Sequence, residues 1–439
     1  MSASAGPVRS PLRTRIPTLE PWLARVSVVA LLVALATNAL RPMVAYRALD
    51  LGASPAEIGL VAASFSILAV VVALPAGAWA DRVGGEIVAV VGTGLMAAGS
   101  FALVFVDSLV LLGAAYTCAG LGQTVTLIGQ QAIVGNTGGR KGRDSRYGVY
   151  TSAASVGQLI GPSLAGALVG AAVFGPGLGQ GAGNAEAAAF LVAAACCVGS
   201  SAICLADLVR MRWAAPSPVR GATAAEEPHP VRSFLPAAGR VLRREGMLRA
   251  MVASTVTVSS IDMLGAYLPV YGEENHLAVE LVGFLLSLRA GATLVSRVLL
   301  GEALRRLGRR RLLSIGLFVA AVTIAIVPVT ASGDVLVILM VAFGLGVGVS
   351  QPITIGWVAD SSPRRERATA IGIRVTANRL SQLVVPVAMG AVAGAAGVAM
   401  IFVALGVLLG SGAAAAATSS FAVPARSVAP EPGPPDAAA

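Results

Sequence analysis

Apolar residues fill this chain in twelve long runs that are separated by short polar segments. An apolar helix of about 20 residues is long enough to cross a lipid bilayer. The pattern therefore predicts an all-α membrane protein. Its twelve transmembrane helices, numbered as spans 1 to 12, are expected at 23–46, 54–80, 87–106, 108–134, 147–173, 185–209, 249–272, 278–300, 312–331, 335–359, 368–393 and 395–422.

The chain repeats itself at a constant offset of 224 residues, so that spans 1 to 6 correspond to spans 7 to 12. The recurring pairs are Gly59 and Gly283, Gly77 and Gly301, Arg82 and Arg306, Gly84 and Gly308, Gly120 and Gly344, Gly122 and Gly346, Gly148 and Gly372, Gln158 and Gln382, Pro162 and Pro386, and Gly166 and Gly390. Glycine matches alone are weak in a chain with 51 glycines, so the glutamine and proline pairs matter most. Two parallel, pseudo-symmetric copies of a six-helix bundle are typical of a parallel-repeat transporter.

These patterns divide the chain into five parts. In order they are an N-terminal tail at 1–22, a first six-helix bundle at 23–209, a connector at 210–248, a second bundle at 249–422 and a C-terminal tail at 423–439. The last part is rich in Pro and Ala, and we expect it to be disordered. Within the connector, 233–247 has Leu, Val and Arg at helical spacing, which fits an amphipathic surface helix or a simple charged linker.

The composition excludes a soluble protein. Hydrophobic residues make up 56% of the chain and charged residues 12%, about half the charge of an average soluble domain. The cysteines fall inside predicted spans, where we expect small core residues rather than disulfides or metal ligands. They are Cys118, Cys196, Cys197 and Cys204.

The placement of charge predicts the orientation. The formal net charge is +10, and the basic residues cluster in the N-terminal tail, in the connector and in the loops after spans 4, 8 and 10. All of these lie on one side, whereas the opposite loops hold Arg47 and several acidic residues. The positive-inside rule places both termini and the connector in the cytoplasm of a multi-pass protein of the cell membrane. This placement argues against a nucleic-acid partner.

No catalytic set is visible in the sequence. His229 lies in the connector and His276 in the loop between spans 7 and 8, away from any buried nucleophile. The single Lys141 stands outside any Gly-rich phosphate-binding motif. We therefore expect no enzyme activity, no catalytic residue, no cofactor and no metal site.

The end of span 2 carries a motif that recurs at the end of span 8. Its residues are Gly77, Asp81, Arg82 and Gly84 in the first copy and Gly301, Arg306 and Gly308 in the second. Together with twelve spans and a two-fold repeat, this motif resembles the signature of the major facilitator superfamily, and the resemblance covers nearly the whole chain. It implies two six-helix bundles that rock around a central substrate site.

The resemblance implies that this motif is a latch, which joins the halves on the inner side while the outside is open. Gly77 would allow close helix packing. Asp81, at the cytoplasmic end of its helix, could pair with an arginine or a helix N-terminus. The second copy has Arg305 where the acid stands, so we expect an asymmetric latch.

Span 5 carries a packing motif made of Gly157, Gly161, Pro162 and Gly166. It is similar to the Gly-Pro motif in span 5 of the drug/proton antiporters of the superfamily. Glycines four residues apart give a flat face for close packing, and proline kinks a helix, which suits a moving interface. Those antiporters also carry an arginine in span 4, at a place where this chain has Tyr116.

Polar residues inside the spans are the candidates for a substrate or coupling cavity, because charges within a bilayer are costly and usually functional. The candidates are Asn38, Arg41, Asp262, Arg289 and Arg379. Spans 3, 6, 9 and 12 have no charge in their interiors, and in the family that the chain resembles these four helices face lipid.

Asp262, the repeat mate of Asn38, is the one carboxylate deep in the predicted membrane region. It could bind a proton or be the fixed partner of Arg289. Arg297 and Arg374 lie nearer the span ends, and we expect them to extend toward the membrane surface.

These features predict a secondary active transporter that moves a small organic solute across the cytoplasmic membrane by alternating access. The span 5 motif favours export, and coupling to protons stays open. The surplus of central arginines over Asp262 predicts an organic anion or zwitterion as substrate, with an amphiphilic drug as the alternative. An uptake permease, or a non-transporting sensor or lipid-handling protein on the same fold, remains an alternative function. We expect a monomer in the lipid bilayer.

Overall fold

The computed structural model describes residues 20–137, 143–174, 186–213, 239, 242–244, 246–361 and 367–418. This described part consists of helices and connecting turns, with no strand, and twelve of its segments are long and apolar enough to cross a membrane. The predicted fold class is confirmed. Most of the predicted amphipathic helix at 233–247, nearly all of the N-terminal tail and the whole C-terminal tail lie outside the described residues.

The helices of the first half correspond one to one with spans 1 to 6. They are α1 (Pro21–Asp50), α2 (Pro55–Val83), α3 (Gly85–Ala102), α4 (Leu109–Asn136), α5 (Arg143–Phe174) and α6 (Ala187–Trp213), with a short 3-10 helix η1 (Leu103–Phe105) after α3. Local sequence signals fix some of the helix starts. Ser54 and Glu57 form a capping box at the start of α2, in which the Ser54 backbone N–H donates to the Glu57 carboxylate over 2.8 Å.

The second half divides one of its spans, span 10, into two helices. The helices of this half are α8 (Met247–Glu274), α9 (Val279–Val298), α10 (Leu300–Ile326), α11 (Gly333–Gly348), α12 (Ser350–Asp360), α13 (Arg367–Ala396) and α14 (Ala399–Ala417), with a 3-10 helix η3 (Val327–Val329) after α10. A break at Val349 divides span 10 between α11 and α12, and a break at Leu299 ends α9 at the predicted end of span 8. The turn between spans 8 and 9 falls inside α10, at Gly308.

Gly308 and its repeat mate Gly84 stand at equivalent turns. Their φ angles are +72° and +96°, a region that favours glycine because a Cβ would be strained there. Gly84 ends α2, and Gly308 separates the two helical parts of α10. The last glycine of the repeated motif is thus required by the backbone itself.

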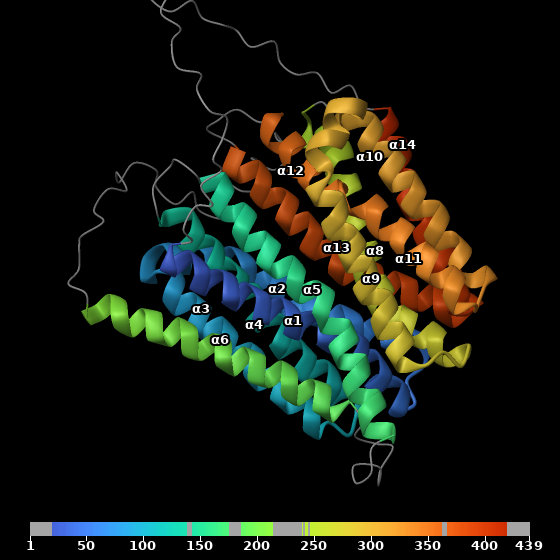
Figure 1. The fold of residues 1–439 in the computed structure, drawn as a ribbon, viewed down its shortest axis with the longest axis horizontal. Helices are drawn as coiled ribbons and strands as arrows, with labels where there is room; N and C mark the ends of the chain where they lie inside the picture. The colour runs from blue at the N-terminus through green and yellow to red at the C-terminus, as the bar shows by residue number, and fades with distance from the viewer. Residues whose placement is uncertain are drawn as a thin grey trace, which may run out of the picture.

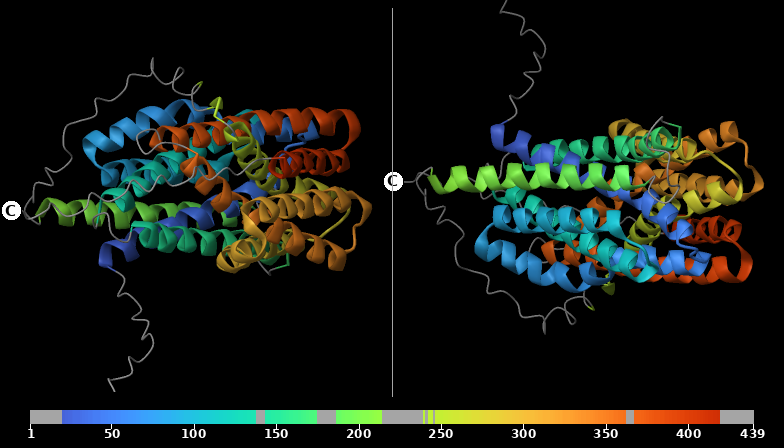
Figure 2. Two further views of the ribbon diagram at one scale, coloured as in Figure 1. Left: turned by 90° about the horizontal axis from the view of Figure 1, so that it is seen from above. Right: turned by 90° about the horizontal axis from the view of Figure 1, so that it is seen from below.

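The two halves lie side by side as two bundles, with the first-half helices α1 to α6 in one and the second-half helices α8 to α14 in the other (Figures 1 and 2). The end of the molecule where α1 begins and α14 ends is called the terminal end here, and the opposite end the far end. The bundles meet along two seams, α2 against α13 and α5 against α9, while α1 and α8 touch at the centre.

Contacts within the two halves repeat with the same offset as the sequence. A Cβ added to Gly120 on α4 would collide with the carbonyl oxygen of Phe65 on α2. A Cβ added to Gly344 on α11 would collide with the carbonyl oxygen of Arg289 on α9. Both members of the second pair stand 224 residues after those of the first, so the recurring glycines mark the same helix crossing twice.

The two seams between the halves are also related by the repeat. The first half contributes the glycine to one seam, and the second half contributes the glycine to the other. A Cβ on Gly59 of α2 would lie 2.5 Å from the Pro386 carbonyl oxygen of α13, and a Cβ on Gly283 of α9 would lie 2.5 Å from the Pro162 carbonyl oxygen of α5. Small residues let helix backbones approach this closely. Both crossings lie toward the far end, where Tyr267 also donates from its hydroxyl to the Pro55 carbonyl over 3.0 Å.

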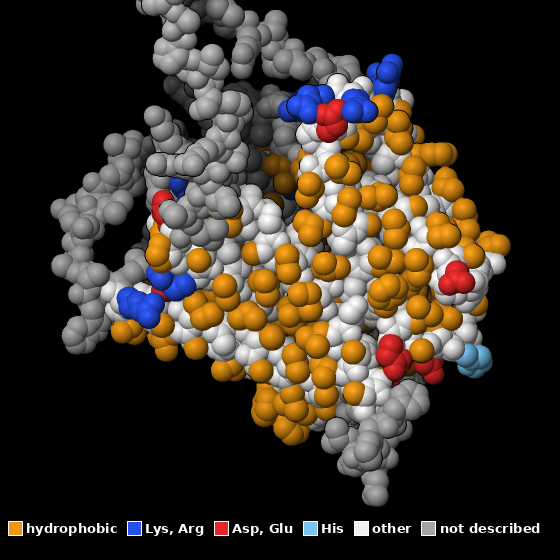
Figure 3. Space-filling model, viewed as in Figure 1, with side chains coloured by type: hydrophobic (Ala, Val, Ile, Leu, Met, Phe, Trp, Pro, Cys, Tyr) orange, Lys and Arg blue, Asp and Glu red, His pale blue; other side chains and the backbone are white. Residues whose placement is uncertain are grey.

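The surface matches a membrane environment. In the view of Figure 3, apolar side chains cover the flank of both bundles, while the charged side chains gather at the two ends. Basic side chains stand at the terminal end in this view, with a few acidic ones among them, and further acidic side chains stand at the far end. The described cysteines are free: Cys197 and Cys204 are buried, and Cys118 and Cys196 are half-buried.

Candidate functional site

A cavity of about 350 Å³ lies between the two halves. Its walls come from α1, α2, α4 and α5 on one side and from α8, α9, α12 and α13 on the other. Among the described residues, spans 3, 6, 9 and 12 contribute nothing to this lining. The lining includes all five predicted cavity residues, which are Asn38, Arg41, Asp262, Arg289 and Arg379.

The two walls of the cavity differ in chemistry. The first half contributes mainly uncharged polar side chains, with Arg41 as its one charged residue in the described lining. These side chains are Thr37, Asn38, Gln123, Thr124, Gln131 and Gln158. The second half contributes the other charges, which are Asp262, Arg289, Arg297 and Arg379. A ligand in this cavity therefore meets amides on both walls and most of the charge on the second-half wall, which also holds Gln351, Asn378 and Gln382.

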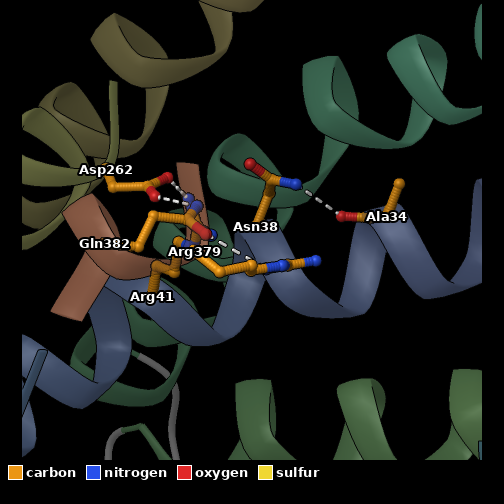
Figure 4. Close-up of polar contacts among 6 residues, drawn as sticks. All are labelled: Ala34, Asn38, Arg41, Asp262, Arg379 and Gln382. Carbon is orange, nitrogen blue, oxygen red and sulfur yellow. Dashed lines mark hydrogen bonds and ion pairs between the residues drawn. The ribbon is translucent and has the colours of Figure 1, made fainter. Parts of the chain in front are cut away.

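Asp262 on α8 forms an ion pair with Arg41 on α1, so it joins the two halves (Figure 4). Its other carboxylate oxygen accepts a hydrogen bond from Nε2 of Gln382 on α13 (Figure 4). Of the two alternatives for Asp262, a fixed pair with Arg289 is not formed in this conformation, since its partners are Arg41 and Gln382. The repeat mate of Arg41 on α8 is Gly265, which lies beside the Arg41 side chain: a Cβ there would lie 3.9 Å from Arg41 Cδ, at ordinary contact distance.

The Arg41, Asp262 and Gln382 side chains separate the central cavity from a second, much smaller one. This second cavity has a volume of about 30 Å³, shares these three residues, and continues toward the far end past Phe65 and Pro386. The Arg41 guanidinium lies 5.6 Å from the Phe65 ring centroid, a cation–π distance. The three side chains thus form the far wall of the central cavity.

Arg289 and Arg379 lie in the cavity wall without an acidic partner among the described residues. Arg289 is 6% exposed, and its Nε has no hydrogen-bond partner in the described part. Arg379 is 9% exposed and donates to Oε1 of Gln382 over 3.1 Å. Two guanidinium groups in a region shielded from water create a strong preference for a counter-charge.

Arg297 and Arg374 do not extend to the membrane surface as expected. Arg374 is 4% exposed and donates to Gln351 and Thr354 of α12. Arg297 crosses between the halves and donates to Ser155 Oγ of α5 over 3.0 Å. Polar side chains on neighbouring helices accept hydrogen bonds from the terminal nitrogens of these guanidinium groups inside the protein, while the Nε atom of each is buried without a partner among the described residues.

The span 5 motif makes contacts in two directions. Cβ atoms added to Gly157 and Gly161 would collide with backbone atoms of α1, so these glycines pack inside the first half. Pro162 and Gly166 face α9 across the seam, where Gly166 lies close to the backbone of Val279. At the same place the Ser163 N–H donates to Ser287 Oγ of α9 over 2.9 Å. One helix thus carries both an internal contact and an interface between the halves.

The glycines Gly77 and Gly301 of the latch motif have open space around them in this conformation, within the part of the chain that the structure describes. A Cβ added to Gly77 or Gly301 would meet nothing within 4 Å, so the expected close packing at Gly77 is wrong here. The reason is that α2 meets the second half at Gly59, 18 residues and about 27 Å away along the helix. Arg306 is exposed and pairs with Glu302 of its own helix. The Asp81 and Arg82 side chains lie outside the described residues.

Sequence reasoning left Gln382 and Phe65 out of the site. Gln382 was visible as the repeat mate of Gln158, a recurrence that does not depend on glycine. Its role beside Asp262 follows from the rotation of α13, which the sequence pattern does not give. Phe65 carried no polar signal, and nothing in the sequence would have pointed to it.

Two repeated helical bundles with a charged cavity between them are typical of membrane carriers that bind their solute at one central site. The comparison with protein families agrees, since the model described as Major Facilitator Superfamily matches residues 26–302 and 250–438. The chain belongs to this superfamily, and it is a transporter of the kind that moves solutes across membranes. A search of the curated proteins gives no match.

Solved structures share the fold at low sequence identity. The nucleoside transporter NupG is 14% identical with a TM-score of 0.71, and the match covers 91% of this chain and 100% of that one. A POT family transporter in complex with 5-aminolevulinic acid is 14% identical with a TM-score of 0.69, covering 90% and 94%. A bacterial homolog of the human lysosomal transporter Spinster, inward-facing and occupied, is 15% identical with a TM-score of 0.69, covering 90% and 95%.

Proposed function

We propose that this protein is a secondary transporter that exports a small organic anion or zwitterion across the cytoplasmic membrane by alternating access. The observation that carries the substrate class is the cavity charge, four arginines against one aspartate among the described lining residues. Because Asp262 is engaged by Arg41, it does not neutralise Arg289 or Arg379. Guanidinium groups bind carboxylates and phosphates through paired hydrogen bonds.

The difference between the two walls supports an orientation for the substrate. Its acidic group would lie against Arg289 and Arg379 in the second half. Its uncharged polar part would face the amides of the first half, where Gln123 Oε1 is buried without a hydrogen-bond partner among the described residues. A free acceptor on this wall favours a substrate that also donates hydrogen bonds, such as a hydroxyl, amide or ammonium group.

The conformation supports alternating access. The halves touch at the far-end seams and at the Arg41–Asp262 ion pair, while the latch glycines Gly77 and Gly301, toward the terminal end, have open space around them in the described part of the chain. With the terminal end in the cytoplasm, as the basic loops favour, this is the inward-facing state. The support for export and for proton coupling is the span 5 motif, which is similar to that of the drug/proton antiporters. Tyr116 argues against antiport, because it replaces the arginine that those antiporters have in span 4.

Ligand-induced thermal stabilisation of the purified protein tests the substrate class, because any ligand of the folded state stabilises it. Organic carboxylates and zwitterions should raise the melting temperature, and cationic amphiphiles should not. Arg289→Gln and Arg379→Gln should each weaken the binding of the best acid at least tenfold. Arg311→Gln, an exposed arginine outside the cavity, is the matched control.

Two results would contradict this proposal. One is stabilisation of the wild type by cationic amphiphiles alone, which would favour a drug exporter with an amide-lined site. The other is unchanged binding of the best acid in both arginine variants. Flux of that acid in proteoliposomes then separates a transporter from a sensor on the same fold.

A further inference from the structure

A further cavity, separate from the central cavity and from the small one beside it, lies inside the first half, at its terminal end, and has a volume of about 260 Å³. It is formed by α1, α3, α4 and α6, and it shares no residue with the central cavity. The cavity extends about 10 Å from its rim to its inner end. Thr137 lies at the rim and Gln130 at the inner end, and seven residues separate them along α4. The volume is enough for several heavy atoms of a ligand.

The inner part of this cavity contains a hydrogen-bond donor without an acceptor. Gln130 is 2% exposed, and its Oε1 accepts from the Tyr150 hydroxyl over 2.9 Å. Its Nε2 has no partner among the described residues. The surrounding side chains are apolar, including Val26, Val29 and Ile133. A buried amide that keeps a free N–H in apolar surroundings indicates a missing acceptor.

The rim of the cavity carries charges of both signs. Arg25 on α1 and Asp207 on α6 pair with each other over 2.5 Å and are neutralised. Glu86 on α3 and Arg210 on α6 also line the cavity, and neither has an ion-pair partner within the described part of the chain. One free anion and one free cation at the same opening favour a ligand that has both charges.

We infer that this cavity is a second ligand site, which binds a zwitterionic amphiphile. The charged groups of the ligand lie at the rim against Arg210 and Glu86. An acceptor oxygen of the ligand receives the Gln130 Nε2 hydrogen, and an apolar portion packs against Val26 and Val29. The same chemistry occurs in a membrane lipid such as phosphatidylethanolamine and in a soluble zwitterionic amphiphile.

Trp22 lines the cavity and provides a local reporter of occupancy. The experiment uses the full chain with Trp79, Trp213 and Trp357 changed to Phe, in nanodiscs of phosphatidylglycerol. Phosphatidylethanolamine with brominated acyl chains is added in increasing fraction in one arm, and an alkyl sulfobetaine with a bromine on its chain in the other. Brominated phosphatidylglycerol measures the quenching that arises from random contact with lipid.

We expect the quenching of Trp22 to saturate as the brominated zwitterion is added. The fraction of zwitterion that is needed should be at least fivefold lower than the fraction of brominated phosphatidylglycerol that gives the same quenching. Saturation by the lipid identifies a lipid site, and saturation by the sulfobetaine alone identifies a site for soluble amphiphiles. Gln130→Leu keeps the side-chain volume and removes the donor, so it should raise the half-saturating fraction at least fivefold. Arg210→Gln, at an exposed position, should do the same without affecting the fold.

Arg311→Gln is the control for Arg210→Gln, because it removes an exposed arginine that does not line this cavity. It should leave the quenching curve unchanged. Equal quenching by the zwitterionic and the anionic brominated probes would overturn the inference. So would an unchanged curve in both Gln130→Leu and Arg210→Gln, which would mean that water alone occupies the cavity.

Discussion

At the scale of single residues, the ion pair between Arg41 and Asp262 has a central position in the molecule. It joins the two halves and separates the central cavity from the small cavity toward the far end. The sequence allowed Asp262 to be found, because a carboxylate inside a span is rare. It did not allow its partner to be found, because several arginines lie at similar depth and helix rotation decides which one faces it.

Removing one member of this pair should destabilise the protein more than removing both. Asp262→Asn leaves Arg41 charged and unpaired, and loss of one partner of a buried pair costs about 3–5 kcal/mol. The double variant Arg41→Gln, Asp262→Asn removes both charges and should recover most of the melting temperature. A double variant no more stable than Asp262→Asn would contradict this coupling. Retained pH-driven transport in any stable variant would exclude Asp262 as the proton site.

Glu186 gives a separate prediction, because it lies just outside the membrane span of α6, which begins at Ala187 in the structure and not at residue 185. It precedes α6, is 6% exposed, and lies near Asp50. Burial, followed by repulsion from Asp50, raises the pKa of Glu186 to about 7. A raised carboxyl pKa means that ionisation costs stability, so the folded state should lose stability as the pH rises from about 4.5 to 7. Glu186→Gln should therefore stabilise the protein at pH 8, by roughly 2 kcal/mol, and have little effect at pH 4. Equal effects at both pH values in thermal unfolding would contradict this assignment.

At the scale of helices, the glycine pattern located the crossings but not their geometry. The spans followed from apolar length, and the structure has the same number of candidate spans. The break at Val349 could not be predicted, because the apolar run of span 10 continues through it. Nor could the sequence reveal that Gly59 packs against the second half while Gly77, on the same helix, packs against nothing.

Gly283→Ala should open the seam between α5 and α9. The new Cβ would lie 2.5 Å from the Pro162 carbonyl oxygen, and overpacking of this kind costs about 1–3 kcal/mol. A cysteine introduced at Ala266, which lines the small cavity, should then react faster with a thiol reagent added at the far end. Gly77→Ala is the matched control, because its Cβ meets nothing within 4 Å. Equal reactivity in the two variants would contradict a role for the seam in closure.

At the scale of the whole molecule, the repeat predicted two bundles, and the structure adds how they are joined. Each half contributes a glycine to one seam and a proline to the other, an exchange that follows from the 224-residue offset once the partner helices are known. The sequence could not give the conformation, since inward- and outward-facing states share the same residues and differ only in which contacts are formed.

The orientation of the molecule can be measured in whole cells. We expect the terminal end in the cytoplasm, because the basic loops lie there. A cysteine at Ser332, exposed near the far end, should react with an impermeant thiol reagent added outside. A cysteine at Thr418, exposed at the terminal end, should react only after the cells are permeabilised. The reverse pattern would place the termini outside.

The unequal charge of the central cavity makes its conformational equilibrium sensitive to voltage. One elementary charge that crosses the full field of an energised membrane changes free energy by about 2.3 kcal/mol per 100 mV. When the two halves rock, the cavity arginines become exposed to the opposite side of the membrane and so to a different electrical potential. The membrane potential, negative inside, would therefore favour the state of the empty carrier in which the cavity opens to the cytoplasm. An anion bound between the walls would cancel part of this bias. The return of the empty carrier, rather than the loaded step, would then be the stage that the membrane potential controls.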